Sequence, residues 1–92
     1  MKKSEFAAMV AERAGIRKKD AEYIVDLTFR CLSDALAQGE RVSVSGFGVF
    51  ETRERAARTG RVPSTGEQIE IPAAQVPVFK PAKQLKEKVN PS

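Results

Sequence analysis

The sequence lacks most of the side chains on which catalysis and metal binding depend. It contains no histidine, no tryptophan and a single cysteine in 92 residues. These absences exclude a conventional zinc site, a Cys–His pair and a Ser–His–Asp triad, and one cysteine cannot form an internal disulfide. The sequence therefore predicts no enzyme, no metal site and no cofactor.

Long apolar runs are also missing, since no stretch approaches the roughly 18 residues of a membrane span. Lys2 and Lys3 resemble the start of a signal peptide, but Glu5 and Glu12 bracket the only apolar stretch nearby. We expect a soluble, cytoplasmic protein without a membrane partner. Its length predicts one domain, residues 1–92, with a thin core, because small domains bury a smaller share of their surface.

Positive charge is present in excess and is unevenly placed. The net charge is +4, and residues 53–61 hold four arginines against one glutamate. Such a local excess is typical of a surface that binds a polyanion. The alternative is a solvated, charged face that only maintains solubility.

The first half of the chain predicts two helices. Ser4 is a candidate N-cap for the first, which should end at Ala14 with Gly15 as a left-handed stop. The second should run from Asp20 to about Gln38 and end at Gly39.

The second helix has more apolar surface than one neighbour can cover. Leu27, Phe29 and Cys31 lie outside its main apolar stripe. Either a sheet or a second copy of the chain should cover them. Cys31 is accordingly interpreted as a small core side chain and not as a nucleophile.

The second half changes to the two-residue period of strands. Val42 and Val44 alternate with polar residues, a Gly-Phe-Gly turn follows at 46–48, and strands are expected at 49–53 and 67–71. Apolar residues return at 76–79, and a short helix should begin at Lys80-Pro81. This order predicts an α+β fold: two N-terminal helices, a small antiparallel sheet extended into a long β-ribbon arm, and a short C-terminal helix.

The arm is the most informative part of the sequence. Residues 53–74 are too polar to pack on the body along their whole length, and an isolated two-stranded ribbon is marginal in water. The arm should therefore project, be mobile when free, and become ordered on a partner. Arg53 and Arg55 share a strand face, whereas aligning Arg58 with them would need a bulge or irregularity near Ala56-Ala57.

Several motifs resemble those of the bacterial HU/IHF family of architectural DNA-binding proteins, and the resemblance covers essentially the whole chain. The motifs are Gly46-Phe47-Gly48-Val49-Phe50, Arg55-Ala56-Ala57-Arg58-Thr59-Gly60-Arg61, Pro63, Thr65-Gly66-Glu67, Ile69-Glu70-Ile71-Pro72 and Val76-Pro77-Val78-Phe79-Lys80-Pro81, together with Ala14-Gly15 and Lys18-Lys19-Asp20-Ala21 in the first inter-helix turn.

The resemblance implies an intertwined dimer that binds double-stranded DNA. Residues 1–51 and 75–92 would form the dimerisation body, and residues 52–74 a flexible arm in the minor groove, with Pro63 as a wedge that kinks the duplex. The implied dimer core is Phe29, Phe47, Phe50 and Phe79. The implied DNA-binding residues are Lys3, Arg53, Arg55, Arg58, Arg61, Pro63, Lys80, Lys83 and Lys86.

The arm is more similar to that of HU than to that of IHF, which implies weak sequence preference. We expect a nucleoid-associated homodimer that favours bent, nicked or flexible DNA; an IHF-like sequence-selective bender and a heterodimer with a paralogue are the alternatives. Val62 and Ser64 depart from the usual asparagine and basic residue at the tip. Arg17 replaces a usual threonine, so the second helix should lack its cap.

Other interpretations compete with this one. Pro63 is also a good turn former at position i+1. Residues 17–19 could lead the recognition helix of a helix-turn-helix, although the helix that follows is too apolar to face a groove. The arm could instead add to the sheet edge of another protein, as in an assembly module.

Overall fold

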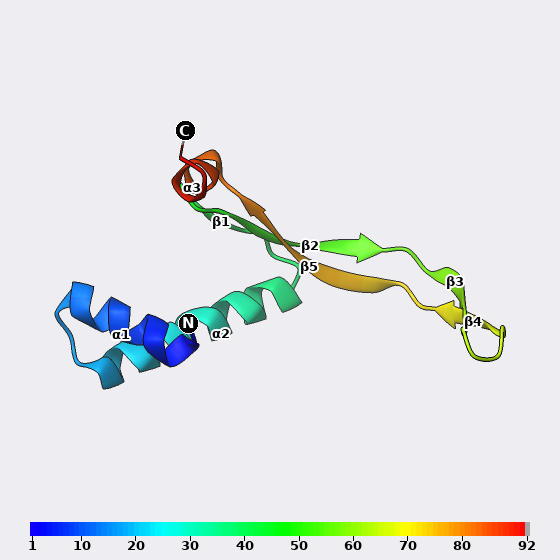
Figure 1. The fold of residues 1–92 in the computed structure, drawn as a ribbon, viewed down its shortest axis with the longest axis horizontal. Helices are drawn as coiled ribbons and strands as arrows, with labels where there is room; N and C mark the ends of the chain where they lie inside the picture. Colours follow the sequence, from blue (N-terminus) through cyan, green and yellow to red (C-terminus); the bar gives the residue numbers. More distant parts are fainter. Residues whose placement is uncertain (92) are drawn as a thin grey trace. The chain divides into compact units, whose positions relative to one another are not determined.

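The computed structural model describes residues 1–91 and confirms the α+β fold class (Figure 1). Contacts divide the chain into two compact units, Met1–Ala35 and Leu36–Ser92. The elements, in chain order, are α1 (Lys3–Ala14), α2 (Lys18–Ala37), β1 (Val42–Val44), β2 (Gly48–Arg55), β3 (Arg58–Arg61), β4 (Gln68–Ile71), β5 (Ala74–Pro81) and α3 (Lys83–Val89).

The helical unit is held together by small side chains. Ala7 and Ala11 of α1 and Ala21 and Val25 of α2 are its buried residues. Because three of these four buried side chains are alanines, there is little apolar volume between the two helices. Gly15 ends α1 in the left-handed conformation, with φ 70°, as predicted. None of the helices within residues 1–91 has the length and hydropathy needed to cross a bilayer.

Two predicted helix starts are wrong. Ser4 lies inside α1, which begins at Lys3 after Lys2, and no side chain caps that end. The second helix begins at Lys18 instead of Asp20, and the Arg17 carbonyl accepts the amide of Ala21 at 3.0 Å. The guanidinium of Arg17 donates to Asp20 at 3.0 Å. This ion pair holds a carboxylate in the first turn, where the helix dipole favours negative charge.

The main sheet is antiparallel in the order β1-β2-β5. Phe50 lies opposite both Val42 and Phe79, so these three side chains share one face. The ring of Phe79 lies 4.7 Å from that of Phe50 and 5.3 Å from that of Phe47, measured between centroids. Phe47, Phe50 and Phe79 thus form one aromatic cluster within the chain, while the dimer core predicted from them and Phe29 stays a prediction. Pro77 lies in β5, at the edge of the sheet, as a proline requires.

The prediction that the last helix begins at Lys80-Pro81 is also wrong. Lys80 pairs with Val49 and Pro81 with Gly48, so both residues belong to β5. The helix α3 begins only at Lys83. Cross-strand pairing with β2, which the local sequence does not reveal, extends the strand by two residues.

In the second unit, which holds the strands and α3, the arm projects from the end opposite α3 (Figure 1). The ladder between β2 and β5 stops at Arg55 and Ala74, and the ladder between β3 and β4 resumes at Arg58 and Ile71. The predicted irregularity is therefore present, but it is no bulge, because two residues are skipped on each strand. Pro72 explains the break, since it has no N–H to give to a ladder.

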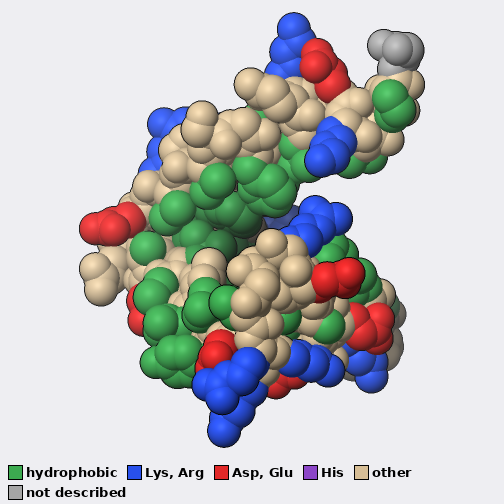
Figure 2. Space-filling view, turned by 90° about the vertical axis from the view of Figure 1, so that its left-hand side faces the viewer, with side chains coloured by type: hydrophobic (Ala, Val, Ile, Leu, Met, Phe, Trp, Pro, Cys, Tyr) green, Lys and Arg blue, Asp and Glu red, His purple; other side chains and the backbone are tan. Residues whose placement is uncertain are grey.

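Much of the apolar surface of the single chain is open to solvent (Figure 2). Phe29 is 49% exposed, Phe47 43% and Phe79 38%. Cys31 is exposed as well, so its interpretation as a core side chain is wrong for the single chain. The reason is its place on α2, outside the face marked by Ala21 and Val25 that packs on α1.

Replacing Gly48 by alanine should destabilise the sheet. A Cβ there would lie 2.5 Å from the Lys80 carbonyl oxygen and 2.6 Å from the Phe79 ring. Overpacking of this kind costs about 1–3 kcal/mol of unfolding free energy. The matched control is Gly60→Ala, whose closest neighbour would be the flexible Ile71 Cδ1 at 3.2 Å, with Ile69 Cγ1 and Ile71 Cγ1 at an ordinary 3.9 Å. Urea unfolding at one protein concentration measures the stability of both variants. Equal unfolding midpoints for the two variants would contradict this packing.

Candidate nucleic-acid interface

The face of the main sheet opposite the aromatic rings carries charged side chains. Since successive residues of a strand point to opposite faces, Glu51, Arg53 and Arg55 lie on the side of β2 away from Phe50. Lys80 lies opposite Val49 and shares their side. We call Glu51, Arg53, Arg55 and Lys80 the ionic face. Three of the predicted DNA-binding residues are thereby brought together.

Glu51 is the centre of the ionic face. Its carboxylate accepts from Lys80 Nζ at 2.8 Å, and Arg41 and Arg53 approach to 3.8 and 3.9 Å. The side chain is only 22% exposed. The hydrogen bond from Lys80 is the main cause that lowers the pKa of Glu51 from its ordinary value, and the charges of Lys80, Arg41 and Arg53 add to it, against the opposing effect of burial.

Arg55 lies where the arm begins, and its side chain contacts the backbone on the opposite side of the arm. Its Nη2 donates to the Pro72 carbonyl at 3.3 Å, across the break between the two ladders. This contact satisfies a carbonyl that the interrupted ladder leaves without a strand partner. Arg55 therefore links the two strands at the point where their backbone pairing fails.

The outer arm presents basic side chains on both of its faces. Arg58 lies opposite Ile71 and Arg61 opposite Gln68. Because the two arginines are three residues apart on one strand, they project to opposite sides of the ribbon. A Cβ on Gly60 would contact Ile69 and Ile71, so these isoleucines share a face, as predicted.

Pro63 is exposed at the tip of the arm, in a tight turn. The Val62 carbonyl accepts the amides of Thr65 at 3.3 Å and Gly66 at 2.7 Å, and the Val62 amide donates to the Glu67 carbonyl at 2.9 Å. Pro63 is thus the second residue of a turn, the position that its fixed φ favours. The same geometry presents its ring to the outside.

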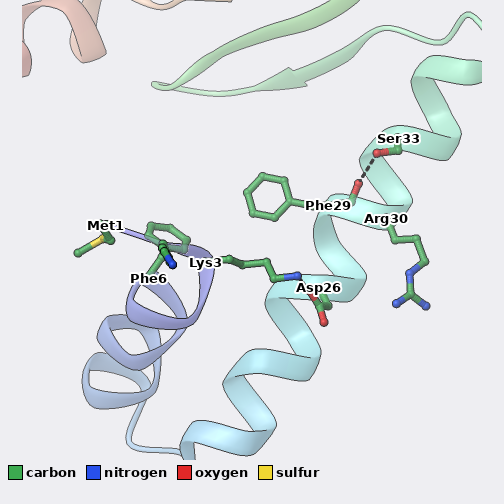
Figure 3. A pocket seen from close by; sticks show the side chains of 8 residues that line it. Met1, Lys3, Phe6, Asp26, Phe29, Arg30 and Ser33 are labelled. Carbon is green, nitrogen blue, oxygen red and sulfur yellow. Dashed lines mark hydrogen bonds and ion pairs between the residues drawn. The ribbon is translucent and has the colours of Figure 1, made fainter.

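The remaining predicted lysines lie on helices. Lys83 and Lys86 belong to α3 and are exposed, and Lys83 pairs with Glu87 at 3.8 Å. Lys3 belongs to the helical unit, where it reaches from α1 to the carboxylate of Asp26 on α2, beside a surface pocket that Phe6 and Phe29 also line (Figure 3). The hydrogen bond from Lys3 is the main cause of the lowered pKa of Asp26.

The glutamate and aspartate partners were not singled out from the sequence. Glu51 shares a strand face with Arg53, which the two-residue period shows, but its nearest partner, Lys80, is brought in by the register of β5. Asp26 meets Lys3 only because the two helices pack side by side. Within residues 1–91 no cluster of potential metal ligands is formed.

The comparison with known families assigns the chain to one of them. A family model described as "Bacterial DNA-binding protein" matches residues 1–90. The chain belongs to this family, the HU/IHF group. Membership confirms the resemblance seen in the motifs and places the chain among DNA-binding proteins and not among enzymes.

Individual relatives agree over the whole length. The chain is 55% identical over 89 residues to a prophage-derived DNA-binding protein HU 2 of Bacillus subtilis, covering 97% of each. It is 54% identical to DNA-binding protein HU of Geobacillus stearothermophilus, covering 97% of this chain and 99% of that one.

Solved structures agree as well. Anabaena HU in a cocrystal with DNA is 43% identical, covers 100% of both chains and superposes with a TM-score of 0.94. HU from Thermotoga maritima is 37% identical, and the match covers 98% of this chain and 100% of that one, with a TM-score of 0.68.

Replacing Lys3 by methionine should raise the pKa of Asp26 toward its ordinary value of 3.8. Because the native pKa is lowered, the ion pair stabilises the fold above that ordinary value and is lost as pH falls through the native one. The stability difference between wild type and K3M should therefore shrink in acid. Carboxyl NMR titration of Asp26 measures the shift. K2M removes a neighbouring charge without this contact, and an equal shift in both variants would contradict the pairing.

Proposed function

We propose that this chain is an architectural DNA-binding protein, a homodimer that binds duplex DNA with little sequence preference and bends it. The observation that carries the proposal is the arm: a protruding ribbon with exposed Arg58 and Arg61 on its two faces and an exposed proline at its tip. The likeness to Anabaena HU, which was crystallised with DNA, supports the same conclusion.

The arm suits the minor groove. A ribbon that lies in a groove has a phosphate backbone on each side, and Arg58 and Arg61 project toward both sides. Arginine binds phosphates and narrow grooves by charge and shape, without selecting base pairs. Two positively charged arms around one duplex explain weak sequence preference.

Pro63 is suited to act as a wedge. Its ring is rigid and exposed, it has no N–H, and the backbone groups of Val62 beside it are bonded within the turn. Inserting this tip between base pairs therefore buries few unsatisfied polar groups. Unstacking costs about a few kcal/mol per step and is offset by contacts that bent DNA makes with the body. Nicked or flexible DNA lowers the cost of bending and should be preferred.

The proposed dimer follows from the uncovered apolar faces. The aromatic cluster consists of Phe47, Phe50 and Phe79, and none of these rings is fully buried. Phe29 on α2 is half exposed. In this proposal a second copy covers them. Residues 1–51 and 75–92 then form the body of one dimeric domain, and residues 52–74 the arms.

The body would carry the DNA between the arms. Lys3, Lys80, Lys83 and Lys86 would bind phosphates there, and Arg53 and Arg55 would bind them where each arm begins. A bender of this kind in a bacterial cell would be cytoplasmic, associate with the nucleoid and help to compact it; pairing with a paralogue would keep the same geometry.

Replacing Pro63 by alanine should reduce bending more than binding. Alanine keeps the arm arginines but removes the rigid ring, so we expect affinity to fall by a few-fold while the bend of a nicked duplex decreases clearly. Energy transfer between dyes at the duplex ends measures the bend, and a titration in the same cell measures affinity. The matched control is Pro77→Ala, an exposed proline in β5 away from the tip.

Equal bends for wild type and P63A would refute the wedge. Failure of the wild type to bind duplex at low salt, or binding that is insensitive to salt, would refute DNA as the partner, because phosphate binding weakens with a slope of about −0.9 per phosphate neutralised.

A further inference from the structure

Two of the cations proposed to bind DNA, Lys80 on the body and Arg53 where the arm begins, are already bound to a carboxylate. Lys80 Nζ lies 2.8 Å from Glu51, and Arg53 Nη2 lies 3.9 Å from it. Both cations remain largely exposed, at 56% and 63% of the side chain, whereas Glu51 is 22% exposed. The arrangement is an anion held at the base of a basic surface, with cations around it that open to solvent.

Stability alone gives a weak reason for such a cluster. Ion pairs with exposed cations contribute little to folding. A phosphate that approaches the ionic face, by contrast, meets Lys80 and Arg53 directly and needs the same N–H donors that Glu51 occupies.

We propose that Glu51 is an internal substitute for phosphate, which holds Lys80 and Arg53 in the free protein and limits DNA affinity by competing for them. The inference rests on the proposed DNA-binding function. Glu51 is then a positioning residue: it touches no DNA, and acts through the cations that do.

Salt dependence should reveal the competition. When phosphates take Lys80 and Arg53, the released Glu51 carboxylate must find another cation, and a salt ion supplies it. This uptake offsets part of the counterion release that drives DNA binding. Removing the carboxylate should therefore make binding tighter at low salt and also steeper in its dependence on salt.

Proton uptake on DNA binding should also reveal the competition between Glu51 and phosphate. In the free protein three cations face Glu51, namely Lys80 from β5, Arg53 from β2 and Arg41 from the residue before β1, and they lower its pKa. In the complex, phosphates draw two of these cations away and add negative charge, so the pKa of Glu51 rises. Binding then takes up protons in mildly acidic solution, and affinity increases as pH falls.

The experiment compares Glu51→Gln with Glu54→Gln in the full chain. Glu54 lies on the same strand, is exposed, projects to the other face and forms no ion pair within residues 1–91. Both variants remove one charge from nearly the same place. The probe is a nicked duplex, titrated across a salt series and from pH 5 to pH 7 with wild type and both variants; circular dichroism verifies the fold.

We expect E51Q to bind about three- to tenfold tighter than wild type at low salt, in line with the loss of competing ion pairs. For E51Q, the slope of log affinity against log salt concentration should steepen by about one unit for each Glu51 replaced. Its affinity should also change less with pH than that of wild type. E54Q should change affinity less than about twofold, the effect of net charge alone. In a Lys80→Met background the gain from E51Q should largely disappear.

Equal effects of E51Q and E54Q would overturn the inference in favour of net charge. Weaker binding by E51Q would overturn it as well, because Glu51 would then orient the cations for DNA instead of competing for them. Both results leave the proposed function intact as long as the wild type binds and bends DNA. Absence of binding by the wild type would refute the function and the inference together.

Discussion

The constraint on which this structure depends is that one chain cannot bury its own large apolar side chains. The buried hydrophobic residues are Ala7, Ala11, Ala21 and Val25, while Phe29, Phe47 and Phe79 stay open to solvent. Hydrophobic burial is the main favourable term in folding, and a chain that leaves its aromatic residues about half uncovered forgoes a large part of it. In the proposed dimer a second copy supplies the missing cover, and the two copies supply two arms for one duplex.

The two-residue period of the strands connects this core to the proposed DNA-binding surface. On β2, Phe50 faces the aromatic cluster, so its neighbours Glu51 and Arg53 must face the other way. In the proposed dimer, burying the aromatic face therefore leaves the ionic face outside. Beyond Arg55 the ladder breaks at Pro72, and the outer ribbon carries charge on both faces because no core lies beneath it. The proposed dimer core and the ionic face thus follow from the same alternation along β2.

Local signals in the sequence predicted local features well. Glycine at position 15, the strand alternation from Val42 and the irregularity before Arg58 are each decided by a few neighbouring residues. The errors lie where distant residues decide. Strand pairing with β2 keeps Lys80 out of the last helix, and helix packing on one face leaves Cys31 exposed. The Glu51 cluster was missed because the register of β5 brings Lys80 to it, and no local pattern encodes that register.

Sedimentation equilibrium of the full chain over a concentration series, combined with urea unfolding at the same concentrations, tests this account most directly. The account predicts twice the mass of one chain at micromolar concentration, and an unfolding midpoint that rises with protein concentration because folding and association are coupled. A folded chain of single mass, with a midpoint independent of concentration, would contradict it.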